Sequence, residues 1–236
     1  GTTGVLTGTS YAFQSGSVSA KLGGSGALAK TTAGTVTLSG ANTYTGHTTV
    51  SDGPLKVTGA GRLYSATHNG TAVVSVQNGG VLELDTWSYG TSQSLGQLAK
   101  EAARIVVNNG TIRMNGTTDY GRGVTVLAGG ATFEAAAGAN WVHGGAFDFT
   151  ANVYTGNPSL TFTGAGNGTF EKIFSGGGTL TKSGSGTWTL SGVNTYTGNT
   201  TVSDGTLQIG AAGKLYGSSN GTATVTIASG TTLKVN

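Results

Sequence analysis

The chain has 236 residues, including 44 glycines, two prolines and no cysteine, and only 9% of its residues are charged. The net charge of +3 is small and no Lys/Arg cluster occurs, which argues against a nucleic-acid partner. Hydrophobic residues make up 36% of the chain, too many for a disordered tail, and no apolar run approaches the ~20 residues of a membrane-spanning helix.

The first long feature, residues 24–85, returns near the end of the chain as residues 176–236. Between residues 24–64 and residues 176–216, 26 of 41 positions are identical. Such internal repetition is typical of solenoids and other repeat architectures.

Each copy contains the sequence NTYTG, which we interpret as a corner of the fold, and we expect the two segments to lie at equivalent corners. Asparagine tolerates turn conformations, the tyrosine is expected to pack across the corner, and the glycine ends the turn. The corner residues are Asn42, Tyr44, Gly46 and Gly53 in the first copy and Asn194, Tyr196, Gly198 and Gly205 in the second.

Short strand–turn–strand units recur throughout the chain. In each unit apolar and polar residues alternate on both sides of a glycine, which is typical of half-buried strands joined by a sharp turn. The units occupy residues 48–57, 74–84, 105–114, 124–134, 200–209 and 225–235. Their corner glycines are too widely spaced for a hairpin meander. The sequence therefore predicts an all-β chain, one parallel β-helix (β-solenoid) of about eight to eleven coils.

One insert, residues 85–107, interrupts this pattern. Ser94 and Gln97 resemble a capping box, and the apolar residues that follow have helical spacing, which predicts a short helix near 94–103. Trp87 and Tyr89 lie in the loop before it and are the candidate ligand-binding residues, because inserts are where repeat proteins place binding surfaces. The alternative is a helix that only covers the core.

Candidate catalytic groups are few and scattered. The sequence has nine carboxylates, its three histidines lack metal-ligand spacing, and no nucleotide-binding motif is present, so we assign no catalytic, cofactor-binding or metal residue. Glu83, Arg113, Glu134 and Asp148 should point outward, and stacked coils could bring Glu83 close to Arg113. We interpret these residues as an exposed charge ladder; the alternative is the carboxylate cluster of a polysaccharide-acting enzyme, which would also involve Asp119.

The segments GTVTLSGANTYTGHTTVSDGPLKV and GTWTLSGVNTYTGNTTVSDGTLQI resemble the passenger-associated transport repeat of bacterial autotransporters. The resemblance covers residues 24–57 and 176–209. It implies a right-handed β-helical passenger segment that is exported by a C-terminal outer-membrane β-barrel, a partner absent from this sequence. It also implies display on a Gram-negative cell surface.

On this basis we expect residues 1–236 to be a single β-helical fragment of a longer protein, continuing beyond Asn236 with further coils. The expected function is a non-enzymatic stalk, scaffold or adhesin whose repeats support export. The alternatives are a polysaccharide-acting enzyme, or a module that binds a host glycan or protein through residues 85–107.

Overall fold

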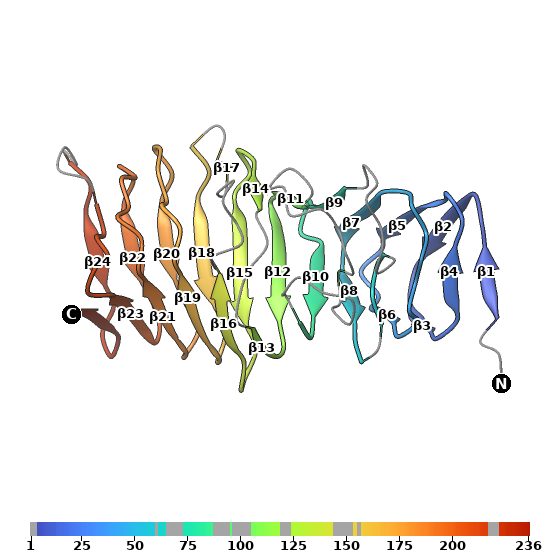
Figure 1. Cartoon of the computed structure of the whole chain (residues 1–236). Helices are drawn as coiled ribbons and strands as arrows, with labels where there is room; N and C mark the ends of the chain where they lie inside the picture. Colours follow the sequence, from blue (N-terminus) through green and yellow to red (C-terminus); the bar gives the residue numbers. More distant parts are fainter. Residues whose placement is uncertain are drawn as a thin grey trace.

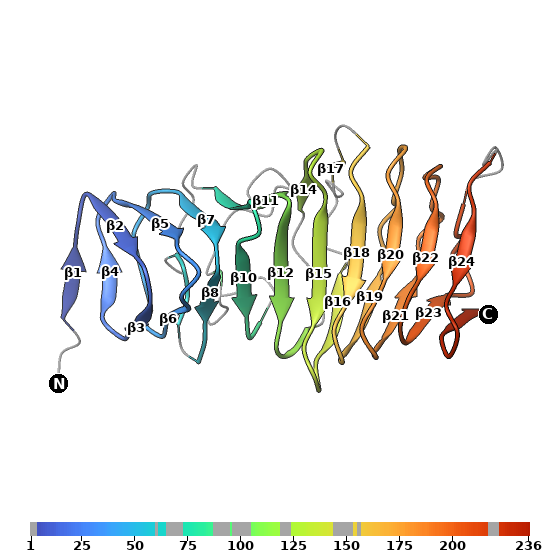
Figure 2. The same ribbon diagram turned by 180° about the vertical axis from the view of Figure 1, so that it is seen from behind.

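The protein is a rod of short strands that wind around a common axis, with the two termini at opposite ends (Figures 1 and 2). The computed structural model describes residues 4–59, 61–64, 73–86, 95, 105–118, 124–143, 153–154, 157–216 and 222–236. These residues form strands and turns and contain no helix. The helix expected at 94–103 lies outside the described residues, except for Leu95, which is buried in the core.

The longest sheet has ten strands and runs along most of the rod. In spatial order it contains β24 (Val225–Ile227), β22 (Thr200–Val202), β20 (Leu180–Lys182), β18 (Leu160–Thr163), β15 (Ala131–Ala135), β12 (Gly110–Met114), β10 (Val81–Leu84), β8 (Pro54–Val57), β6 (Val36–Leu38) and β3 (Gly16–Val18).

Three further sheets complete the sides of the rod. The seven-stranded sheet contains β17 (Val153–Tyr154), β14 (Thr125–Val126), β11 (Ile105–Asn108), β9 (Val74–Gln77), β7 (Thr48–Asp52), β5 (Ala27–Thr31) and β2 (Ser10–Phe13). The six-stranded sheet contains β13 (Thr117–Thr118), β16 (Asn140–His143), β19 (Asn167–Phe170), β21 (Thr187–Leu190), β23 (Thr206–Ile209) and β25 (Thr232–Val235). Strands β1 (Val5–Thr7) and β4 (Lys21–Gly23) pair with each other.

Every strand pairing in the described part of the chain is parallel, and each strand inside a sheet pairs with strands of the coils before and after it. Leu160, Leu180 and Thr200 occupy one register position in three successive coils, 20 residues apart. Antiparallel hairpins would reverse the chain at each turn. The predicted parallel β-helix is therefore confirmed.

Alternate residues of each strand point inward and stack in columns from coil to coil. One column of the ten-stranded sheet runs Val36, Leu55, Leu82, Ile112, Phe133 and Phe162, and all six side chains are buried. Phe162 lies with its ring centroid 4.6 Å from that of Trp188 and 5.2 Å from that of Phe170. Because aromatic side chains bury a large apolar area, this aromatic cluster contributes strongly to the core.

The outward face of the same sheet carries a continuous threonine column. One register position is threonine in six successive strands, namely Thr111, Thr132, Thr161, Thr181, Thr201 and Thr226. Threonine suits an outward strand position because its branched side chain packs on the pleated surface while its hydroxyl stays in water.

The two repeat copies do not lie on the same side of the rod. The first strand of copy one, β5, belongs to the seven-stranded sheet, whereas its counterpart in copy two, β20, belongs to the ten-stranded sheet. The second strand of copy one, β6, belongs to the ten-stranded sheet, whereas its counterpart β21 belongs to the six-stranded sheet. The second copy is therefore rotated by one face about the rod axis. We expected the two NTYTG corners to be equivalent in the rod, and this was wrong in one respect, because the segment between the copies does not complete a whole number of coils.

We predict that Phe162→Ala lowers the free energy of unfolding by about 3–5 kcal/mol, because it empties a fully buried aromatic site. Thr161→Val, on the outward face of the same strand, should cost less than about 1 kcal/mol. Urea denaturation of both variants measures the difference. Equal losses would mean that the inward column is not the main source of stability.

Candidate functional site

The asparagine of each NTYTG corner connects three successive coils. Asn42 Oδ1 accepts a hydrogen bond from the backbone N–H of Leu22, 2.9 Å away, and Asn42 Nδ2 donates to the carbonyl of Arg62 at 2.8 Å. Asn194 repeats this arrangement, since its Oδ1 accepts from Phe174 N at 2.8 Å and its Nδ2 donates to Lys214 O at 2.7 Å.

These two asparagines do not serve as left-handed turn residues. Among the described non-glycine residues, positive φ angles occur only at Asn78, Asn109 and Asn157. Both corner asparagines are buried, so their side-chain bonds form away from water. Their role at the corner is therefore side-chain hydrogen bonding between coils rather than the turn conformation that the sequence suggested.

The tyrosine of each corner lies in the core and shares a hydroxyl network with the next coil. The hydroxyl of Tyr44 is 2.6 Å from Thr48 Oγ1, which is 2.9 Å from the hydroxyl of Tyr64. In the second copy Tyr196 and Tyr216 surround Thr200 in the same way, at 2.6 and 2.7 Å. Burial raises the pKa of Tyr44, Tyr64 and Tyr196 well above the ordinary value, so these phenols stay protonated and act as structural hydrogen-bonding groups.

The corner glycines are required for two different reasons. A Cβ atom on Gly46 would lie 2.4 Å from the carbonyl oxygen of Gly26, and one on Gly198 would lie 2.2 Å from that of Gly178. Any side chain there would force adjacent coils apart. Gly53 and Gly205 also approach backbone oxygens of the preceding coil closely, and in addition they have φ angles of 60° and 64°, which non-glycine residues rarely adopt.

A lysine occupies an inward position in each copy. Lys30 stands in register between Phe13 and Val50, and Lys182 between Phe162 and Val202. Both side chains are fully buried.

The ammonium group of each lysine reaches backbone carbonyls at the coil corner. Lys182 Nζ donates to the carbonyls of Ser183, Gly184 and Asp204 at 2.8, 2.6 and 3.0 Å, which uses all three of its donors. Burial lowers the pKa of Lys182 to about 8, and the charge of Asp204 opposes this shift. Lys30 likewise donates to the carbonyls of Thr32 and Asp52.

His47 and Asn199, which differ between the copies, make the same contact. His47 Nδ1 accepts the backbone N–H of Val73 at 2.9 Å, and Asn199 Oδ1 accepts that of Thr224 at 3.0 Å. The position requires a hydrogen-bond acceptor but not an imidazole. This excludes a catalytic histidine as the reason for the residue at this corner.

A chain of alternating charges crosses the outward face of the ten-stranded sheet. Glu83 Oε1 lies 2.8 Å from Lys56 Nζ, and its Oε2 lies 3.3 Å from Arg113 Nη1. Arg113 Nε is in turn 3.0 Å from Glu134 Oε2. The predicted proximity of Glu83 and Arg113 is confirmed. We call Lys56, Glu83, Arg113 and Glu134 the ion ladder.

Two carboxylates meet at this ladder, yet neither is suited to donate a proton. Asn115 Nδ2 donates to Glu83 Oε1 at 2.9 Å and to Asp85 Oδ1 at 3.3 Å. Burial alone would raise the pKa of Glu83, but the bonds from Lys56, Asn115 and Arg113 outweigh burial and place it below the ordinary value. The pKa of Asp85 is lowered too, because the hydrogen bonds from Thr58, Gly59 and Asn115 outweigh the effect of burial. A glycoside hydrolase needs one carboxyl group with a raised pKa.

Other candidate sites have the following positions. Trp87, Tyr89, Asp119 and Asp148 lie outside the described residues, so the binding surface expected in the insert stays a prediction. Among the described residues no three His, Cys, Asp or Glu side chains form a metal-binding group. Within the same residues no helix is long and apolar enough to cross a membrane.

We predict that Asn194→Ala lowers the free energy of unfolding by about 1–3 kcal/mol, because it removes the acceptor of the buried backbone N–H of Phe174 and one of the two hydrogen bonds to the carbonyl of Lys214. Asn42→Ala should have a similar effect. Asn167→Ala is the matched control, since its bond to Thr187 N is exposed and water can replace it. Denaturation curves in which the control loses as much stability would contradict this prediction.

Glu83→Gln should destabilise the rod at pH 7 by about 1–3 kcal/mol, because Lys56 and Arg113 lose a charged partner. The pKa of Glu83 is lowered in the folded state, so its stabilisation is present above the unfolded value of about 4.3 and is lost as the pH falls through the lowered value. The stability difference between the variant and the parent chain should therefore shrink in acid. Urea titrations of the variant and the parent chain at pH 7 and pH 3 measure this difference, and Glu171→Gln, at an exposed position, is the control. A difference in unfolding free energy that is the same at both pH values would contradict the prediction.

Comparison with known proteins agrees with this architecture. The family model described as passenger-associated-transport-repeat matches residues 28–57 and 180–209, the two segments singled out in the sequence. Over 96% of its length the chain is 32% identical to the adhesin BmaC autotransporter of Brucella suis biovar 1 (strain 1330), and it spans 7% of that protein. No solved structure matches the chain significantly. The chain thus carries two passenger-associated-transport repeats and is similar to a segment of an autotransporter.

Proposed function

We propose that this segment is a non-enzymatic rod within a surface-displayed passenger, and that its two repeats lock successive coils together. The observation that carries this proposal is that the buried residues that hydrogen-bond from coil to coil are present in both copies. They are Lys30 and Lys182, and Asn42 and Asn194. These side chains bind the backbone of adjacent coils and leave no group free for a substrate, which is what a structural element requires.

The proposed setting follows from the relative and the repeat family. The parent protein would carry the segment to a Gram-negative cell surface through its C-terminal outer-membrane β-barrel, and the repeats would support that export. Each corner needs the coils on both sides of it for its hydrogen bonds, so a folded repeat gives the adjoining coil a template.

Surface display of the parent protein tests this role. Asn42→Ala with Asn194→Ala should reduce the amount of passenger on intact cells, measured with an antibody against the passenger. Substitutions at exposed positions of the same corners, Thr45→Ala with Thr197→Ala, should leave it unchanged. Equal display of all variants would contradict a role of the repeats in export.

An adhesive role is the second candidate, favoured by the printed name of the similar Brucella protein. The expected contact residues are Trp87 and Tyr89, and the partner would be a host glycan or protein. Trp87→Ala with Tyr89→Ala should abolish binding of the purified chain to a glycan array or to host cells, if the insert is the binding surface. Unchanged binding would assign adhesion to another part of the passenger.

We also predict that the purified chain does not cleave polysaccharides, because the pKa values of both grouped carboxylates are lowered. Reducing-end assays on a panel of acidic and neutral polysaccharides provide the measurement. Turnover that disappears in Glu83→Gln or Glu134→Gln would favour the enzyme alternative instead.

A further inference from the structure

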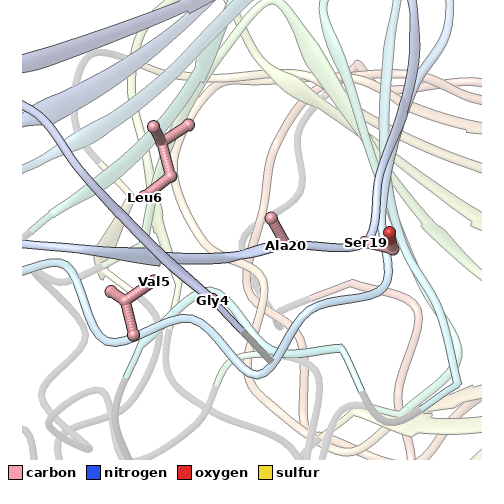
Figure 3. A pocket seen from close by; sticks show the side chains of 5 residues that line it. All are labelled: Gly4, Val5, Leu6, Ser19 and Ala20. Carbon is pink, nitrogen blue, oxygen red and sulfur yellow. The ribbon is translucent and has the colours of Figure 1, made fainter. Parts of the chain in front are cut away.

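The pocket beside β1 offers little chemistry to a ligand. It has a volume of about 410 Å³ and is lined by Gly4, Val5, Leu6, Ser19 and Ala20 (Figure 3). The hydroxyl of Ser19 is the one polar side-chain group in this lining, so we assign the pocket no ligand. Asparagine side chains on the surface of the rod carry more chemistry.

Six asparagines begin the sequence Asn-x-Thr, in which x is not proline. This sequence, the sequon, is the acceptor pattern for an N-linked sugar. The structure describes four of these asparagines, and they differ in what their side-chain amides contact. The six are Asn69, Asn109, Asn115, Asn167, Asn199 and Asn220, of which Asn69 and Asn220 lie outside the described residues.

Three of the four described amides are held against a neighbouring coil. Asn115 Nδ2, the atom that would receive a sugar, donates to Glu83 Oε1 at 2.9 Å and to Asp85 Oδ1 at 3.3 Å. The Oδ1 atoms of Asn167 and Asn199 each accept a backbone N–H of the next coil at 3.0 Å. A transferase that reorients any of these amides has to break a contact between coils first.

Asn109 differs from these three, because its backbone is fixed while its side chain is not engaged. Its N–H donates to the carbonyl of Gly130 at 2.8 Å, and its own carbonyl accepts the N–H of Gly79 at 2.6 Å. The side chain is exposed and makes no hydrogen bond with any residue that the structure describes. With a φ angle of 59°, Asn109 forms the corner between β11 and β12 and presents its amide to solvent.

The surroundings of Asn109 leave room for a sugar. Gly79 lies beside it in the coil before and Gly130 in the coil after, so neither neighbour has a side chain that covers the amide. A Cβ atom on Gly79 would meet no atom within 4 Å, which shows that the space there is open. Within the sequon Gly110 is buried and Thr111 faces outward in the threonine column. The acceptor amide and the threonine of the sequon therefore both reach the surface.

A left-handed turn by itself does not produce this combination. Asn78 and Asn157 have φ angles of 53° and 56°, but Asn78 is followed by two glycines and Asn157 by a proline. Of the three described asparagines with positive φ, Asn109 alone begins a sequon. An accessible amide, a fixed backbone and a complete acceptor sequence thus coincide at this residue.

We propose that Asn109 is the acceptor for an N-linked sugar, in preference to the other three described sequons. The donor is a sugar whose anomeric carbon carries a phosphate leaving group, and a separate transferase catalyses the step. A bond forms between Asn109 Nδ2 and the anomeric carbon, and the bond from that carbon to the phosphate oxygen breaks. The phosphate-bearing group leaves with the electron pair of that bond, and an amide proton passes to a base of the transferase. Because the Asn109 side chain bonds to no other described coil, the sugar leaves the pairing of coils intact.

Peptide mass spectrometry of the parent protein, purified from the organism that produces it, tests the proposal. Fragmentation that preserves the bond between sugar and peptide should show higher glycan occupancy at Asn109 than at Asn115, Asn167 or Asn199. A single added sugar indicates a nucleotide-activated donor, whereas a preassembled oligosaccharide indicates a lipid-linked donor. An unmodified Asn109 would overturn the proposal, as would equal occupancy of Asn109 and Asn115.

Two variants separate the effect of the sequon from that of the fold. Asn109→Gln removes the acceptor, and Thr111→Val removes the hydroxyl of the sequon but keeps a branched side chain in the strand. Both should lose the glycan. Thr132→Val is the matched control and should keep it, since Thr132 stands in register with Thr111 in the same outward column but belongs to no sequon. Circular dichroism verifies that each variant is folded. Retention of the glycan in Thr111→Val, or its loss in Thr132→Val, would overturn the proposal.

Discussion

The whole structure depends on backbone pairing between coils rather than within them. No coil can satisfy its own N–H and C=O groups, so each strand is held by the strands about 20–30 residues before and after it in register. This constraint explains why residues far apart in the sequence form single columns. It also explains why a side chain that bridges coils, such as Asn42, has a larger effect than its size suggests.

The rotation of the second repeat copy by one face follows from the same constraint. A repeat contacts only the coils next to it, so its local structure does not depend on which side of the rod it occupies. The asparagine and tyrosine contacts of both copies are nearly identical although their strands belong to different sheets. The coil is therefore the structural unit, and the sheet is a consequence of stacking.

The six strand–turn–strand units and the glycine turns at Gly53 and Gly205 could be predicted, because alternation and glycine turns are local signals. The inward lysines could not, since lysine is normally exposed and its burial depends on carbonyls supplied by another coil. The sequence did contain one signal for this burial. Lys30 lies two residues after Leu28, and alternate residues of a strand share a face. The rotation of the copies escaped prediction because it depends on the summed lengths of all intervening turns.

The ion ladder shows how the stacking of coils pairs charged side chains that would otherwise be available at the surface. Stacking places Lys56, Glu83, Arg113 and Glu134 in one outward column with alternating sign, so each charge finds its opposite one coil away. A slip of one coil would place like charges together, which disfavours the wrong order of coils. Groups committed to one another in this way are poorly placed to act on a substrate. The ion ladder is therefore better explained as a set of contacts that fixes the register of the coils than as a catalytic or binding site. This agrees with a rod in which the specific interactions connect one coil to the next.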